Sequence, residues 1–173
     1  TLWIALALSS YSALGSFVGQ ARGSVELVIS SRRAVYLTML VLIVSTLSLV
    51  TLFINRDFEV AYVAGHSDLA MPDRFTWVAF YAGNEGSLLY IAFSLATMTA
   101  LAIWRAPSSV RDTLPYTTGV LMLVLAFFLA VMGFMANPFD KLPFVPPDGD
   151  GINPLLTHFG TVSYTHLTLP TKA

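Results

Sequence analysis

The sequence predicts an all-α membrane protein with about four transmembrane helices, long ordered outer loops and an interfacial helix. Hydrophobic residues make up 55% of the 173 residues and charged residues 11%, whereas an ordinary globular domain has roughly 25% charged residues. Four stretches are long and apolar enough to approach the about 20 residues that cross a hydrocarbon core. Two longer segments outside these stretches carry aromatic, proline and acidic residues. A chain this apolar cannot cover a surface exposed to water on all sides.

The composition also excludes several classes of protein. Nine Lys and Arg against ten Asp and Glu leave no basic surface for nucleic acid. The high hydrophobicity excludes a disordered tail. With no cysteine in the sequence, a disulfide framework, a thiolate metal site and a cysteine nucleophile are excluded as well.

Three of the four predicted spans are free of charge and bounded by charged or helix-breaking residues. They cover 34–54, 88–104 and 119–136. The first span, 2–18, is interrupted by serines, and a cleavable secretory signal peptide is the competing interpretation, although no positive segment precedes it. The chain opens at Thr1 rather than at methionine, from which we expect the sequence to be a fragment.

The distribution of basic residues predicts the orientation. The loops after the first and third spans hold five arginines: Arg22, Arg32, Arg33, Arg105 and Arg111. The segments after the second and fourth spans hold three basic residues, Arg56, Arg74 and Lys141. Because short loops rich in Lys and Arg stay in the cytoplasm, the N-terminus and the two long segments are expected outside.

The first long outer segment, 55–87, combines three local patterns. Apolar residues alternate with others over 58–63, which favours a short extended piece. Pro72-Asp73 then resembles a helix start, and Asn84-Glu85-Gly86-Ser87 would supply polar caps to the third span. We interpret Glu85 first of all as an acid that compensates the dipole of that helix.

The predicted helix in this segment has an aromatic face. Trp77, Phe80 and Tyr81 follow one another at i, i+3 and i+4, so they share one side of the helix. One interpretation is a flat helix that anchors the chain at the membrane interface. The other is part of a docking surface for a flat apolar ligand.

The second long outer segment, 137–154, contains five prolines, which block both helix and sheet and predict an extended, ordered connector. Asp148 and Asp150 lack the spacing of a calcium loop. The three histidines, His66, His158 and His166, lie outside the predicted spans and are interpreted as surface residues rather than ligands. The spans carry no charge, which argues against an ion path.

Several motifs in order resemble the CcmF family of cytochrome c maturation proteins, the haem lyase component. They are the run 58–64 with His66-Ser67 and Met71-Pro72, then 85–89, then 136–139, Asp148-Gly149 and 152–156. The resemblance covers about 20–162. Tyr81 and Ile91 stand where the family has tryptophan, and Thr157-His158-Phe159 also departs from it. After Val162 the sequence resembles neither a span nor the family, so 1–162 is expected to be the native N-terminal transmembrane region and 163–173 a non-native tail.

The resemblance implies a role in attaching haem covalently to apocytochrome c at the outer face of the bacterial inner membrane. It implies b-type and substrate haem as cofactors, and as partners apocytochrome c, a haem chaperone, other maturation subunits and membrane lipid. The family's haem ligands lie beyond Val162, so no catalytic residue and no metal ligand is assigned here. Trp77, Tyr81 and Glu85 are the candidate residues of a haem-docking surface. Two other readings stay open: a multi-span transporter or respiratory-complex membrane subunit, and a non-catalytic assembly partner.

Overall fold

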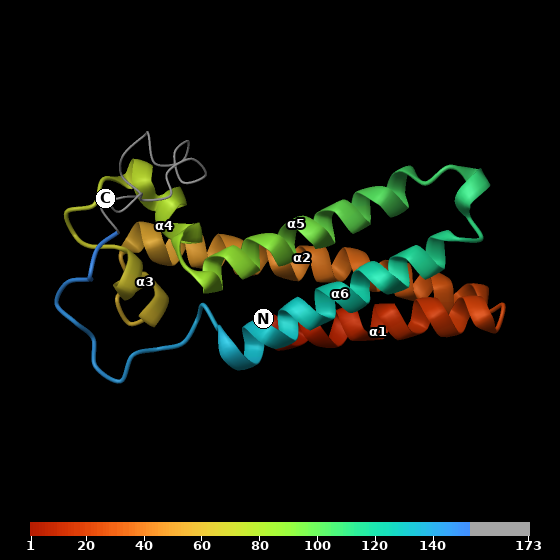
Figure 1. Ribbon diagram of the computed structural model, residues 1–173, viewed down its shortest axis with the longest axis horizontal. Helices are drawn as coiled ribbons and strands as arrows, with labels where there is room; N and C mark the ends of the chain where they lie inside the picture. Colours follow the sequence, from red (N-terminus) through yellow and green to blue (C-terminus); the bar gives the residue numbers. More distant parts are fainter. Residues whose placement is uncertain (153–173) are drawn as a thin grey trace, which may run out of the picture.

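Four long helices run up and down along the length of the molecule in the computed structural model, which describes residues 1–152 (Figure 1). They are α1 (Leu2–Ala21), α2 (Val25–Asn55), α5 (Asn84–Arg105) and α6 (Leu114–Met135). Each is long and apolar enough to cross a membrane. The predicted all-α membrane fold and its four spans are therefore confirmed.

The four helices form a ring in which each packs against two neighbours. Helix α1 lies between α2 and α6, and α5 lies opposite, also between α2 and α6. Short turns join α1 to α2 and α5 to α6 at one end of the bundle, while the longer outer segments gather at the other end (Figure 1). The two long segments predicted from the sequence therefore lie at the same end of the bundle.

Small residues allow α1 to approach its neighbours closely. Its buried face is made of residues no larger than leucine, and mostly of alanine, glycine and serine: Leu2, Ala5, Ser9, Ser12, Ala13, Gly15, Ser16 and Gly19. The Ser12 hydroxyl donates to the carbonyl oxygen of Ser31 on α2 at 2.9 Å. Small faces of this kind are how helices pack in lipid, where apolar burial gives little advantage. Three serines of the first span, Ser9, Ser12 and Ser16, thus face the bundle interior.

Helix α2 begins earlier than the sequence pattern predicts. Its first residue is Val25, and the side chain of Ser24 caps it by accepting a hydrogen bond from the Leu27 amide. Arg32 and Arg33 therefore lie within the helix, and their assignment to a loop is wrong. At 31 residues the helix is about 46 Å long, which exceeds a hydrocarbon core of about 30 Å. Its first turns can therefore extend past the hydrocarbon.

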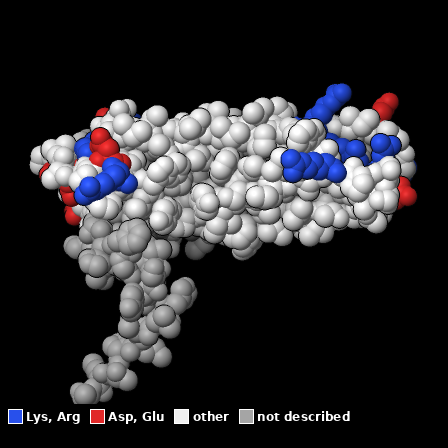
Figure 2. All heavy atoms as spheres, turned by 90° about the horizontal axis from the view of Figure 1, so that it is seen from above, with Lys and Arg blue, Asp and Glu red and all other residues white. Residues whose placement is uncertain are grey.

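Charged residues lie at the two ends of the bundle and leave the middle apolar (Figure 2). The end with the short turns holds the five arginines listed above, with Glu26 and Asp112. The end with the long segments is acidic, with Arg56, Arg74 and Lys141 as its basic residues within the described chain. The charge asymmetry behind the predicted orientation is thus a feature of the folded chain.

The end of the bundle that carries the two long segments contains three short helices. They are α3 (Ala61–His66), the 3-10 helix η1 (Asp73–Phe75) and α4 (Thr76–Ala82). The helix start predicted at Pro72-Asp73 is confirmed. The extended piece predicted over 58–63 is wrong from Ala61 onward, where the chain becomes helical, and its one sheet-like contact is a bridge between Val60 and Lys141.

The polar caps predicted before the third span are also not formed as expected. Helix α5 begins at Asn84 itself, with Gly83 in the capping position and no side-chain cap hydrogen bond. Glu85 lies in its first turn, as predicted. The Ser87 hydroxyl instead donates to the carbonyl oxygen of Tyr81 at 2.8 Å, so it ties the end of α4 to the start of α5.

The proline-rich connector is ordered and non-helical over 137–152, as predicted; Pro154 lies outside the described residues. It lies along α3 through backbone hydrogen bonds: the Ala61 amide donates to Asp140, and the Asp150 amide donates to Ala64, each at 2.8 Å. The Lys141 ammonium also donates to a Glu59 carboxylate oxygen at 3.0 Å. The connector thus fixes α3 at the end of the bundle that carries the two long segments.

Candidate functional site

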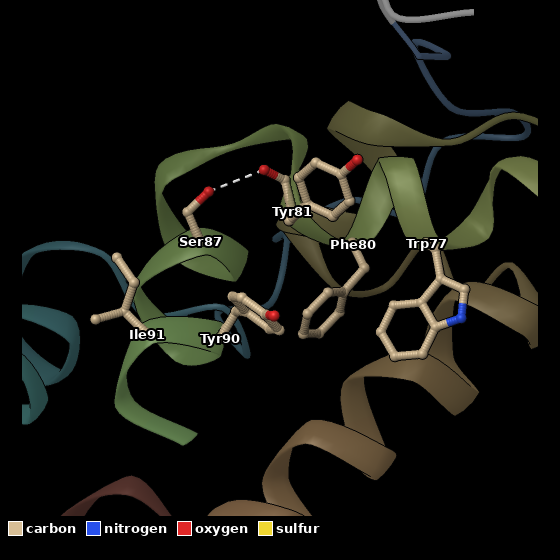
Figure 3. A pocket seen from close by; sticks show the side chains of 6 residues that line it. All are labelled: Trp77, Phe80, Tyr81, Ser87, Tyr90 and Ile91. Carbon is tan, nitrogen blue, oxygen red and sulfur yellow. Dashed lines mark hydrogen bonds between the residues drawn. The ribbon is translucent and has the colours of Figure 1, made fainter. Parts of the chain in front are cut away.

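The sequence-predicted aromatic residues line one cavity, where α4 meets the start of α5 (Figure 3). Its volume is about 540 Å³, and its lining is Trp77, Phe80, Tyr81, Ser87, Tyr90 and Ile91. Small-molecule pockets in proteins span roughly 300–1,000 Å³. The cavity therefore has the size of a binding site and an aromatic lining.

The cavity has a buried floor and exposed walls. Phe80 is fully buried, whereas the exposed fractions of Trp77 and Tyr81 are 60% and 48%. The rings of Trp77 and Phe80 meet edge to face with centroids 5.5 Å apart, an arrangement that aromatic pairs favour. The walls come from two elements, and the hydrogen bond from Ser87 to Tyr81 holds those elements together (Figure 3).

Two of the three predicted site residues line the cavity, and the third does not. Trp77 and Tyr81 line the cavity together with Phe80, as their shared helical face suggests. Glu85 does not line it, although it lies close in sequence. Burial is the main cause of the raised pKa of Tyr62 on α3, and the negative charge of Glu85 adds to it.

Sequence reasoning missed the half of the lining that comes from α5. Ser87, Tyr90 and Ile91 repeat the i, i+3, i+4 spacing of the α4 residues, so they share one face of α5. That repeat was a usable signal. What the sequence did not show is that the two faces meet, which depends on the turn at Gly83.

A buried tyrosine holds that turn. The Tyr62 hydroxyl donates to the carbonyl oxygen of Phe80 at 2.8 Å and accepts from the Gly83 amide at 3.1 Å. Burial raises the pKa of the Tyr62 phenol, against the opposing effect of nearby backbone amides. The phenol therefore stays protonated at neutral pH and can donate, which links α3 to both elements of the site.

The backbone of α5 at Gly86 lies in close contact with the end of α4. A side-chain carbon at Gly86 would lie 1.7 Å from the carbonyl oxygen of Phe80 and 2.5 Å from the Tyr62 hydroxyl. Only glycine leaves room for this approach of α5 to the end of α4. The shape of the cavity therefore depends on Gly86 as much as on the aromatic residues.

His66 is part of this support and not of the lining. Its Nδ1 lies 3.0 Å from the carbonyl oxygen of Tyr62, and the two rings are 4.5 Å apart. Among residues 1–152, no group of three His, Cys, Asp or Glu side chains could hold a metal ion. His158 and His166 lie outside the described residues. The lining of the described cavity is thus mainly aromatic and apolar.

Comparisons with known proteins agree on one family. No family model matches the chain. The chain is 34% identical over 170 residues to the cytochrome c-type biogenesis protein CcmF of Escherichia coli, covering 96% of this chain and 25% of that protein. It is 31% identical over 162 residues to CcmF of Pseudomonas aeruginosa, covering 93% of this chain and 25% of that protein.

A solved structure gives the same result. The structure titled cytochrome c heme lyase CcmF matches with a TM-score of 0.75 and 27% identity, over 82% of this chain and 24% of that chain. The chain thus spans about a quarter of the length of these relatives. The chain is therefore part of the CcmF-like family.

Proposed function

We propose that this chain acts in cytochrome c maturation as part of a membrane haem lyase, and that the aromatic cavity docks haem. The observation that carries the proposal is the cavity itself, an aromatic site at the outer end of a CcmF-like bundle. A haem macrocycle is flat and largely apolar, and it matches exposed aromatic walls over a buried aromatic floor. The size of the cavity also suits part of such a ligand.

The residues present fit a docking role rather than the chemistry of attachment. Trp77 and Tyr81 would contact the macrocycle face or edge, while Phe80 closes the floor. Among the described residues, no histidine lines the cavity, so iron ligands would come from outside this surface. Haem bound here would supply the vinyl groups that react with the apocytochrome thiols, and this chain's residues would hold and orient it.

The proposed setting is the bacterial inner membrane with the long segments outside. The arginine-rich end then faces the cytoplasm, in line with the positive-inside rule. The outer end would meet a haem chaperone, apocytochrome c and the other maturation subunits. Glu85, near the rim but outside the lining, would serve the start of α5 rather than the ligand.

Tryptophan fluorescence tests haem docking at a defined place. The chain has three tryptophans: Trp77 lines the cavity, whereas Trp104 lies at the opposite end of α5, about 20–25 Å along that helix from the lining residues of α5. Two single-tryptophan variants in nanodiscs, each keeping one of these two residues, are titrated with haem. We expect saturable quenching of Trp77, and at Trp104 only the gradual quenching that haem dissolved in lipid causes.

Cavity variants complete that titration. Changing Tyr81 and Tyr90 to alanine in the Trp77-only variant should weaken haem binding about thirtyfold, since the two aromatic contacts contribute roughly 1 kcal/mol each. The matched control is Tyr11→Ala with Tyr116→Ala, a pair of exposed tyrosines away from the cavity. Equal, non-saturable quenching at both tryptophans would mean that haem does not dock in this cavity.

A further inference from the structure

A second cavity lies at the opposite end of the bundle, where the N-terminus of α2 meets the end of α1 and the start of α6. Its volume is about 400 Å³, and its lining includes the side chains of Arg32 and Arg111. The rest of the lining is small or apolar apart from Gln20 and Ser24. No carboxylate side chain lines this cavity. Two guanidinium groups thus share one hollow without an acid to balance them.

The charge of Arg32 is uncompensated within the described chain. Its Nε is shielded from solvent and has no hydrogen-bond partner among residues 1–152. No salt bridge of Arg32 or Arg111 occurs among those residues either. A guanidinium group that is partly removed from water without a partner is costly, and an anion in the cavity would offset that cost. Because a guanidinium can donate two parallel hydrogen bonds, phosphate is a well-matched anion.

The neighbouring acids do not fill this role. Glu26 is exposed in the first turn of α2 and Asp112 is exposed in the turn before α6, and neither lines the cavity. The Gln20 amide donates to the backbone carbonyl of Asp112 at 3.1 Å, which fixes one wall. The positive end of the α2 dipole adds to the field of the arginines, since the cavity adjoins Ser24 and Val25.

The apolar part of the lining points to a lipid. Val25 and Ile29 line the cavity and are 70% and 43% exposed, on a helix that crosses the membrane. An anionic phospholipid would place its phosphodiester between the arginines and its acyl chain along these two residues. Basic hollows between transmembrane helices at the cytoplasmic boundary are known to bind such headgroups. Free phosphate would leave the apolar edge unused.

We infer that this cavity binds an anionic phospholipid, with Arg32 and Arg111 holding the phosphodiester. The inference is independent of haem docking, because the two cavities lie at opposite ends of the bundle. Charge alone would attract anionic lipid to any of the five arginines at this end, where Figure 2 shows basic side chains gathered. The experiment must therefore separate the cavity from the general basic surface.

Native mass spectrometry of the purified chain provides that separation. The chain is titrated with phosphatidylglycerol, with phosphatidylcholine and with inorganic phosphate. The test variant is Arg32→Gln with Arg111→Gln. The control is Arg33→Gln with Arg105→Gln, which removes the same charge at the same end from residues outside the lining. We expect phosphatidylglycerol to bind the wild type and the control at least about tenfold more tightly than the test variant.

Three results would overturn the inference. The first is that the test and control variants lose the same affinity for phosphatidylglycerol. The second is that the wild type binds phosphatidylglycerol and phosphatidylcholine equally. The third is that inorganic phosphate binds as tightly as phosphatidylglycerol. If the double variant does not reach the membrane, Arg111→Gln alone carries the test, since Arg111 is exposed and its loss does not disturb packing. That variant should bind phosphatidylglycerol about threefold more weakly than an Arg105→Gln control, and equal binding would again overturn the inference.

Discussion

The Gly86→Ala variant should lose the native packing of α3, α4 and the start of α5. The added carbon would lie 1.7 Å from the carbonyl oxygen of Phe80, and that atom belongs to the backbone, so no flexible side chain can move aside. Relief requires α4 to separate from α5, which breaks the Tyr62 hydrogen bonds to Phe80 and Gly83. Overpacking of this kind costs about 3 kcal/mol.

Thermal melting of the purified protein measures this effect. A loss of about 3 kcal/mol corresponds to a fall of roughly 6–12 °C in Tm for a chain of this size. The control is Gly65→Ala in α3, where a side-chain carbon would meet nothing within 4 Å and alanine favours the helix. If both variants melt at the wild-type temperature, the close approach of α5 to α4 is not what shapes the cavity.

The second large effect is expected at Gly149 in the connector. A side-chain carbon there would lie 1.9 Å from the carbonyl oxygen of Ser67 and 2.7 Å from that of Ala64. The adjacent Asp150 and Gly151 amides donate to these same two oxygens. Gly149→Ala should therefore separate the connector from α3, with a loss of roughly 3 kcal/mol in the stability of this contact.

Trypsin reports that separation directly. Lys141 is the basic residue of the connector within the described chain, and it is held beside Val60 and Glu59. Cleavage after Lys141 should be at least about tenfold faster in Gly149→Ala, since the open form is more populated. Gly65→Ala again serves as control. Unchanged cleavage would show that the connector does not depend on this contact.

The four spans could be predicted because each is an apolar run whose length the hydrocarbon thickness dictates. Their ends could not be placed by that rule alone. Helix α2 extends beyond the apolar run to a cap at Ser24, at the arginine-rich end of the bundle, since charged residues are compatible with a helix once it leaves the hydrocarbon. The alternation of residues at 58–63 favours a short extended piece, but Tyr62 forms its buried hydrogen bonds from a helix.

The half of the cavity lining that comes from α4 could be predicted from the sequence, and the half from α5 could not. Its α4 residues share one face by helical spacing, which the sequence shows without any structure. The α5 residues have the same spacing, but their meeting with α4 depends on Gly83 and Gly86, whose close contacts are tertiary. Glu85 was grouped with the aromatic residues by sequence proximity, while the helical turn directs it elsewhere.

The central claim, a role in cytochrome c maturation, is tested most directly by replacement. In Escherichia coli CcmF, to which the chain is 34% identical, the matching stretch is replaced by residues 1–162 of this chain. The chimera is produced in cells that lack their own CcmF. Covalently bound haem in c-type cytochromes is then measured. We predict that the chimera restores maturation, and that Trp77→Ala with Tyr81→Ala in the chimera lowers it about tenfold. A chimera that reaches wild-type abundance in the membrane but leaves the cytochromes without haem would contradict the claim.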